Sequence, residues 1–213
     1  MKKHILLIAV TILFAFNAFA QQGNYEAAMS QNLERMRNAR TMEEHQQVVN
    51  TFERIAAAEQ QQWLPAYYAT LTYINMSDNE KDGDKKDQLL DKAQLYLDKA
   101  FKLAPEESEL HVLQGYVHLM RISVSPMVRG LKYSGMAIEN FEKARALNPD
   151  NPRVYFMLGS TKFNTPAMFG GGPEAAKPYL SIAKEKYDQA KPASALAPSW
   201  GRKTAESLLA QCE

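Results

Sequence analysis

The chain has 213 residues, enough for one domain or one elongated repeat array. Hydrophobic residues make up 46% and charged residues 23%, which is ordinary for a chain with a packed core and excludes wholesale disorder. The 25 lysines and arginines balance 24 acidic residues, so no basic field supports nucleic-acid binding, and one cysteine excludes both an intramolecular disulfide framework and a cysteine-based zinc site.

Residues 1–20 are predicted to be a secretory signal peptide. A cationic start at Lys2 and Lys3 precedes an almost wholly apolar run over residues 5–16, and Ala18-Phe19-Ala20 has the small-x-small cleavage pattern. The apolar run is too short to favour a membrane span. We therefore expect an exported protein, periplasmic or alternatively extracellular, with no integral membrane segment after cleavage.

Residues 21–61 are predicted to form an N-terminal helical pair, over residues 25–37 and 42–60. Thr41 and Glu44 have the spacing of a capping box, which predicts the start of the second helix. Val48, Phe52 and Ile55 loosely follow the offsets of the repeats downstream. This pair is therefore a candidate degenerate repeat.

A repeat dominates the remaining chain, and its first two copies are 44 residues apart. Its members are Ala93, Leu97, Ala100 and Pro105, then Ala137, Phe141, Ala144 and Pro149, and then Ala176, Leu180 and Ala183 without a closing proline. Apolar residues at three- and four-residue steps predict helices, and the small residues mark places where two helices cross closely. One helical pair cannot bury its apolar stripe alone, whereas stacked pairs can.

This pattern resembles the tetratricopeptide repeat family, most closely in the second helix of each unit and at Tyr155, Leu158 and Gly159 of the first. The resemblance implies an all-α, right-handed solenoid of helical hairpins. We expect about three long repeats over residues 62–190, with flanking helices and a C-terminal capping helix within residues 191–213. The family's unit of about 34 residues is shorter than this one. We place the excess in loops between the two helices of each pair.

The family binds partners along the concave face lined by the first helix of each unit, so the resemblance also implies a binding groove. The corresponding positions are Tyr73, Met76, Glu109, Val112, Tyr116, Leu119, Arg153, Phe156, Ser160 and Phe163. Aromatic residues and methionine with few charges suit a peptide or helix with apolar anchors. The alternative is that a terminal helix of the chain itself folds into this groove.

Three predicted interhelix loops, over residues 77–86, 123–132 and 164–173, should emerge on one edge of the array. The first resembles the opening of an EF-hand loop but has Lys86 and Leu89 where ligands are needed, so we expect no metal. Arg129 in the second could meet an anionic group or cap a neighbouring loop. The third offers Phe169, Gly170, Gly171 and Gly172, whose N–H groups could cradle an anion, although the Gly-Lys-Ser/Thr of a phosphate loop is missing.

The sequence contains no arrangement of residues typical of a catalytic site. His111 and His118 share a helical face but occupy packing positions, and Cys212 is interpreted as a small apolar residue of the last helix. We therefore expect no enzyme activity and no cofactor. The leading hypothesis is an exported scaffold that binds another protein or peptide through the groove. The alternative is a carrier of a small molecule or lipid that serves a transporter.

Overall fold

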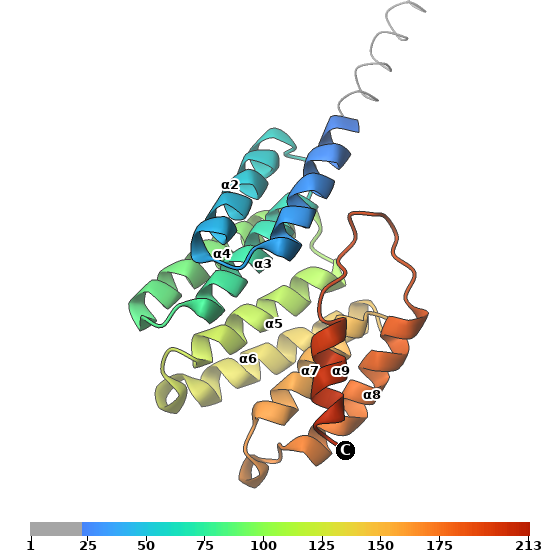
Figure 1. Ribbon diagram of the computed structural model, residues 1–213. Coiled ribbons are helices and arrows are strands. Elements are labelled where there is room, and N and C mark those ends of the chain that lie inside the picture. Colours follow the sequence, from blue (N-terminus) through green and yellow to red (C-terminus); the bar gives the residue numbers. More distant parts are fainter. Residues whose placement is uncertain (1–22) are drawn as a thin grey trace, which may run out of the picture.

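The computed structural model describes residues 23–213, and these form an all-helical array (Figure 1). The predicted signal peptide lies outside the described residues. A first helix covers residues 23–38. It is followed by α2 (Met42–Ala58), α3 (Leu64–Asn79), α4 (Gly83–Leu103), α5 (Ser108–Ile122), α6 (Pro126–Leu147), α7 (Pro152–Asn164), the 3-10 helix η1 (Ala167–Phe169), α8 (Pro173–Gln189) and α9 (Arg202–Ala210).

The helix boundaries follow local sequence signals. The predicted capping box is present at α2, where the Thr41 side chain accepts from the Glu44 N–H and the Glu44 carboxylate accepts from the Thr41 N–H. Proline occupies the first turn of α3, α6, α7 and α8, where its missing N–H has no helical acceptor in any case. Pro105 and Pro149 each follow a helix C-cap and prevent the helix from continuing.

The repeat predicted from the sequence is confirmed by the packing. All nine repeated alanine, leucine and phenylalanine side chains of the second helices are fully buried. Close helix crossing also occurs at the predicted glycines. A Cβ atom at Gly115 would lie 2.3 Å from the Phe141 ring, and one at Gly159 would lie 2.8 Å from the Leu180 side chain. Larger residues at these glycines would therefore push the paired helices apart.

Helical hairpins stack along the array. The pairs α3 with α4, α5 with α6 and α7 with α8 make the most extensive contacts, and the first helices α3, α5 and α7 also contact one another in that order. The turns within these hairpins follow one another along the lower left side of Figure 1. They therefore lie on one edge of the solenoid, as the sequence predicts.

The prediction of three long loops is wrong for the first two. Only residues 80–82 and 123–125 separate the helices there, and the extra length extends α4 to 21 residues and α6 to 22. Both segments contain helix-start signals: Asp82 accepts from the Lys85 N–H, and Pro126 opens α6. Only the third segment is an irregular turn, over residues 165–172 around η1.

Candidate functional site

The predicted concave groove is largely closed to solvent. Buried positions are Tyr73, Met76, Glu109, Val112, Arg153 and Phe156. Half-buried positions are Tyr116, Leu119, Ser160 and Phe163. The groove residues are therefore brought together by α3, α5 and α7, but few of them offer surface to a partner in this arrangement.

The chain's own C-terminal segment occupies part of this groove. Residues 190–201, which we call the C-terminal strap, connect α8 to α9 without regular structure. The Trp200 ring stacks on Tyr116 with centroids 5.9 Å apart and meets the Phe156 ring edge-on at 6.2 Å. Its indole N–H donates to the Tyr67 hydroxyl at 2.7 Å. The sequence left open that a terminal helix folds into the groove, but the segment that enters it is the irregular strap before α9.

A second contact fastens the strap further along its length. The Tyr68 hydroxyl donates to the carbonyl of Leu196 at 2.7 Å, and the Leu196 side chain is buried in the N-terminal part of the core. At the other end, the Tyr187 hydroxyl donates to the carbonyl of Trp200 at 3.0 Å. The strap thus ties the first complete hairpin to the last.

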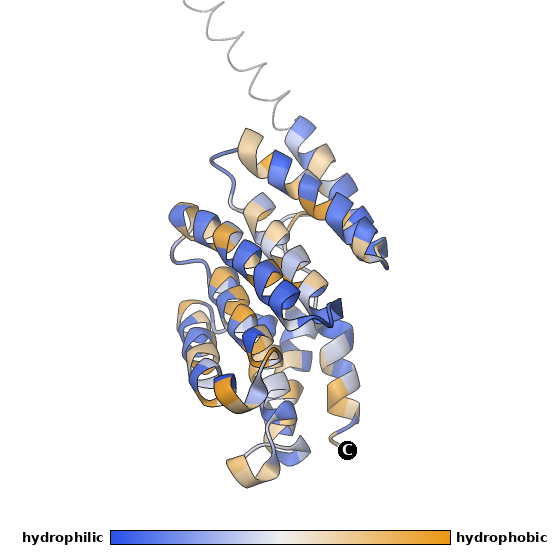
Figure 2. Cartoon of the chain, turned by 90° about the vertical axis from the view of Figure 1, so that its left-hand side faces the viewer, coloured by the Kyte–Doolittle hydropathy of each residue, from blue (hydrophilic) through white to orange (hydrophobic). Residues whose placement is uncertain are grey.

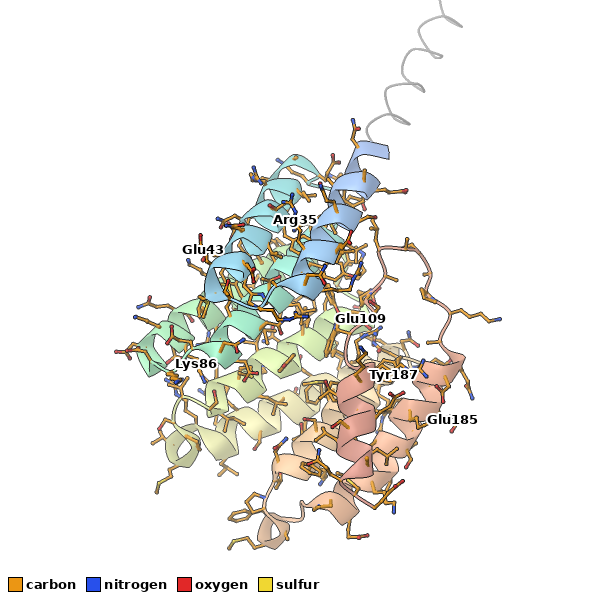
Figure 3. The ribbon with its side chains drawn as sticks, viewed as in Figure 1. Arg35, Glu43, Lys86, Glu109, Glu185 and Tyr187 are labelled. Carbon is orange, nitrogen blue, oxygen red and sulfur yellow. The ribbon has the colours of Figure 1, made fainter. Side chains whose placement is uncertain are left out.

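Beneath Trp200 lies a buried ion pair between Glu109 and Arg153. The Glu109 carboxylate accepts from the Arg153 Nε at 2.8 Å and pairs with its Nη2 at 2.8 Å. It also accepts from the Tyr67 hydroxyl at 2.8 Å and from the Asn151 amide at 2.7 Å. Glu109 and Tyr187 lie close to where the strap enters α9 (Figure 3). Because the buried charges are paired and bonded, the cluster holds its geometry instead of offering a free charge.

The pKa values of the groove residues fit this static role. Burial and the Glu109 carboxylate raise the pKa of Tyr67 well above its ordinary value. Burial lowers the pKa of Arg153, but the Glu109 carboxylate together with the Tyr67 and Tyr187 hydroxyl groups more than offsets burial, so the pKa is raised. Burial also raises the pKa of Tyr116 to about 12. These groups therefore keep their usual protonation near neutral pH.

The loop edge is the part of the described chain where large apolar side chains are most exposed. We define it as Met127, Val128 and Leu131 of α6 together with Met168 and Phe169 of η1. Each of these side chains is at least 71% exposed, whereas no other exposed large hydrophobic residue described exceeds 53%. Figure 2 shows hydrophobic colouring both at the beginning of α6 and on the lowest turn, where η1 lies. Large apolar side chains that are exposed in groups mark an interaction site more often than single scattered ones do.

The topology brings the two parts of the loop edge to the same side. α5 and α7 are successive first helices that contact one another, so their C-terminal ends lie at one edge. The beginning of α6 follows α5 directly, and η1 follows α7.

The candidate anion contacts of the loop edge are used within the chain. Arg129 lies on α6 and not in a loop, and its guanidinium makes two 2.7 Å bonds to the Asp87 carboxylate of α4. The N–H groups of Gly170, Gly171 and Gly172 donate to carbonyls of the same turn and of the end of α7. The anion cradle that the sequence left open is not formed in this arrangement, because these donors close the turn. Phe169, in contrast, is exposed.

The glycines of this turn serve its backbone conformation. Gly170 and Gly172 have φ values of 76° and 98°, in the left-handed region that favours glycine. A Cβ atom at Gly171 would lie 2.1 Å from the Thr165 carbonyl oxygen. The three residues therefore fix how η1 presents Met168 and Phe169 to solvent.

The remaining candidate residues are buried. His111 approaches the Pro105 carbonyl, and His118 lies between Gln114 and the Tyr133 ring. The Cys212 thiol donates to the Leu208 carbonyl, and burial raises its pKa.

Residues 23–213 contain no group of three or more acidic, histidine or cysteine side chains arranged to hold a metal. In the same range, no helix combines the length and apolar character needed to cross a membrane.

A shallow pocket of about 260 Å³ lies between helix 23–38 and α2. Its residues are Ala28, Gln31, Asn32, Arg35, Thr51, Arg54, Ile55 and Ala58. This volume is below the roughly 300–1,000 Å³ typical of small-molecule sites. The exposed loop edge is therefore the better candidate for a ligand with a large apolar surface.

Sequence reasoning identified the loop edge only in part. It selected Phe169, but not Met127, Leu131 or Met168, because exposure of an apolar side chain depends on which neighbour covers it. It also gave Trp200 no part in the groove, because nothing in the local sequence indicates that this side chain packs on Tyr116 and Phe156.

The fold and its surfaces define a helical-repeat scaffold with a closed groove and an exposed apolar edge. A thermophilic tetratricopeptide repeat protein from Thermus thermophilus shares this fold, with a TM-score of 0.54 and 16% identity over 90% of this chain and 94% of that one. The HusA haemophore from Porphyromonas gingivalis has a TM-score of 0.80 and 30% identity over 89% of this chain and 92% of HusA. The chain belongs to the family of HusA.

No family model matches the chain, and no curated protein matches it significantly. The tetratricopeptide resemblance is therefore supported at the level of the fold. Membership of that sequence family remains a prediction.

Proposed function

We propose that this protein is an exported carrier of a porphyrin, which binds at the loop edge. The observation that carries the proposal is the relationship to HusA, a haemophore, over nearly the whole length of both chains. A porphyrin is a broad, flat and largely apolar molecule. The loop edge supplies exposed methionine, leucine, valine and phenylalanine side chains that such a molecule can cover.

The alternative function, a scaffold that binds a protein through the concave groove, has less support. Trp200 of the strap already stacks on Tyr116 and meets Phe156, two of the predicted groove residues. A partner would have to displace the strap and break these contacts. Binding at the loop edge requires no such displacement.

Titration of residues 21–213 with haem and with metal-free protoporphyrin IX tests the proposal. We expect a shift of the Soret absorbance band that saturates at one porphyrin per chain. Phe169→Ala combined with Leu131→Ala should weaken binding about 100-fold or more, because covering each large apolar side chain contributes roughly 1.5–3 kcal/mol. Leu95→Ala is the matched control, since Leu95 is an exposed leucine on α4 outside the loop edge.

Native mass spectrometry of the protein purified gently from its own compartment separates the two functions. Extra mass of a few hundred daltons that is lost on denaturation supports the carrier. A bound second polypeptide, together with no porphyrin binding in the titration, would overturn the proposal in favour of the scaffold.

A further inference from the structure

The loop edge is free of acidic residues along the chain segments that form it. Residues 110–138 and 151–173 contain no aspartate or glutamate. The turn between α3 and α4 is different, because Asp78, Glu80, Asp82 and Asp84 lie in or beside it. The second and third turns of the same edge therefore share a chemical character that the first turn lacks.

Two cations on the acid-free segments have no acidic partner among the described residues. Lys132 lies one residue after Leu131, is exposed, and contacts the Tyr133 ring at 5.6 Å. Lys162 lies near the end of α7, shortly before η1. Neither forms an ion pair within the described chain, whereas Arg121 and Arg129 both pair with Asp87.

Because the two arginines are paired and the two lysines are not, the segments that form the loop edge retain the positive charges of Lys132 and Lys162. An apolar ligand without charge would gain nothing from Lys132 and Lys162 and would lower their hydration. A ligand with carboxylates at its margin would place its apolar body on the patch and its anionic groups on the lysines. The acidic first turn would repel those carboxylates and direct them towards α6 and η1.

We propose that the loop edge selects porphyrins that carry free carboxylates, and that Lys132 and Lys162 receive these groups. This inference rests on the proposed function and narrows its ligand class. It predicts that charge, in addition to the shape of the macrocycle, determines affinity. It also predicts that binding weakens with salt, because the screening length falls from about 30 Å at 0.01 M to 3 Å at 1 M ionic strength.

The test compares protoporphyrin IX with its dimethyl ester, which has the same macrocycle but no carboxylate. Both are titrated into residues 21–213 in the same proportion of dimethyl sulfoxide, at low and high salt. We expect the ester to bind about tenfold more weakly at low salt and to show little dependence on salt, unlike the diacid.

Lys132→Gln and Lys162→Gln should each weaken diacid binding about threefold, and the double variant about tenfold, without changing ester binding. Lys102→Gln is the matched control, because Lys102 lies in the last turn of α4 and forms no ion pair within the described residues. Thermal unfolding should coincide for all four proteins and the wild type, which separates binding from folding.

The outcomes distinguish the two proposals. If diacid and ester bind equally well and the lysine variants change neither, the carboxylate inference is wrong and the porphyrin carrier stands. If the wild type binds neither porphyrin, the proposed function fails and the inference fails with it.

Discussion

The concave groove and the loop edge use similar residues in opposite ways. In the groove, aromatic side chains and a charged pair are buried, and the charged pair and the tyrosines beside it are hydrogen-bonded. At the loop edge, apolar side chains face solvent and two lysines have no acidic partner within residues 23–213. The difference arises from the non-repeating C-terminal strap, which covers one surface and leaves the other open. In a short array, the terminal segments thus determine which repeat surface is free for binding.

The largest expected effect concerns the buried ion pair. Arg153→Ala should lower the free energy of unfolding by about 3–5 kcal/mol, because it leaves the Glu109 carboxylate buried without its partner. Arg129→Ala removes a more exposed pair with Asp87 and should cost about 1 kcal/mol or less. Urea denaturation of both variants measures the difference. Equal losses would show that the groove is no more critical to stability than the surface.

A smaller effect is expected at the strap. Trp200→Ala should lower the free energy of unfolding by about 2–3 kcal/mol, less than a fully buried tryptophan, because Trp200 is half-buried. Trp200→Phe keeps an aromatic ring but loses the bond to Tyr67, and should cost about 1 kcal/mol.

Release of the strap can be followed directly in the same variants. Leu196 is buried within the strap, so chymotrypsin, which cleaves after large apolar residues, should cut after Leu196 faster in Trp200→Ala than in the wild type. Trp63→Phe, which leaves the strap contacts intact, serves as the control. Unchanged cleavage in Trp200→Ala would mean that Trp200 does not hold the strap.

Acid should lower the free energy of unfolding through two buried histidines, His111 and His118. Burial lowers the pKa of His111 and His118 below the ordinary 6.5, so below that pH the unfolded chain binds protons that the folded chain does not. Stability present above pH 6.5 is therefore lost as the pH falls, by up to about 1.4 kcal/mol per pH unit for each histidine. Denaturation midpoints between pH 7 and 5 measure this loss.

His118→Asn should flatten that pH dependence. His118 faces Arg121 of its own helix and Glu139 of α6. Besides burial, the Arg121 charge lowers the pKa of His118, and the Glu139 charge raises it by a smaller amount. A variant that loses stability in acid as steeply as the wild type would exclude His118 as a contributor.

The smallest effect on stability is expected at the loop edge. Phe169→Ala and Met168→Ala should change the free energy of unfolding by less than about 0.5 kcal/mol, because these side chains contribute little to the core. The same variants should weaken porphyrin binding. Substantial destabilisation would instead assign these side chains a structural role, and thermal unfolding distinguishes the two.

The repeat core could be predicted from the sequence because its small and apolar residues recur at fixed spacings and its helix starts are marked by neighbouring residues. Ala93, Ala137 and Ala176 occupy equivalent positions, and the same physical demand for a small residue at a helix crossing acts at each. The helix starts at Thr41 and Pro126 depend on neighbouring residues alone. The lengths of α4 and α6 were misjudged, because the turn-like residues that suggested loops also begin helices.

The strap and the exposed edge could not be derived in the same way. The bonds from Tyr67 to Trp200 and from Tyr68 to Leu196 join residues 133 and 128 positions apart, and no periodicity encodes such pairs. Exposure at Met127 and Leu131 likewise depends on the absence of a covering element within the described chain. The sequence did predict that the turns share one edge and that Phe169 lies on it, and the lack of acidic residues in these segments can also be read from the sequence.

Docking of the strap is a condition for covering the tyrosines of the α3–α4 hairpin. Tyr67 and Tyr68 bond to Trp200 and Leu196, which lie 133 and 128 positions further along the chain, so these tyrosines stay uncovered until the strap has docked. A molecule that is cut within the strap would expose aromatic surface and an incompletely covered ion pair. A docked strap thus marks a fully folded molecule, and proteolytic quality control can recognise a molecule in which these tyrosines are bare.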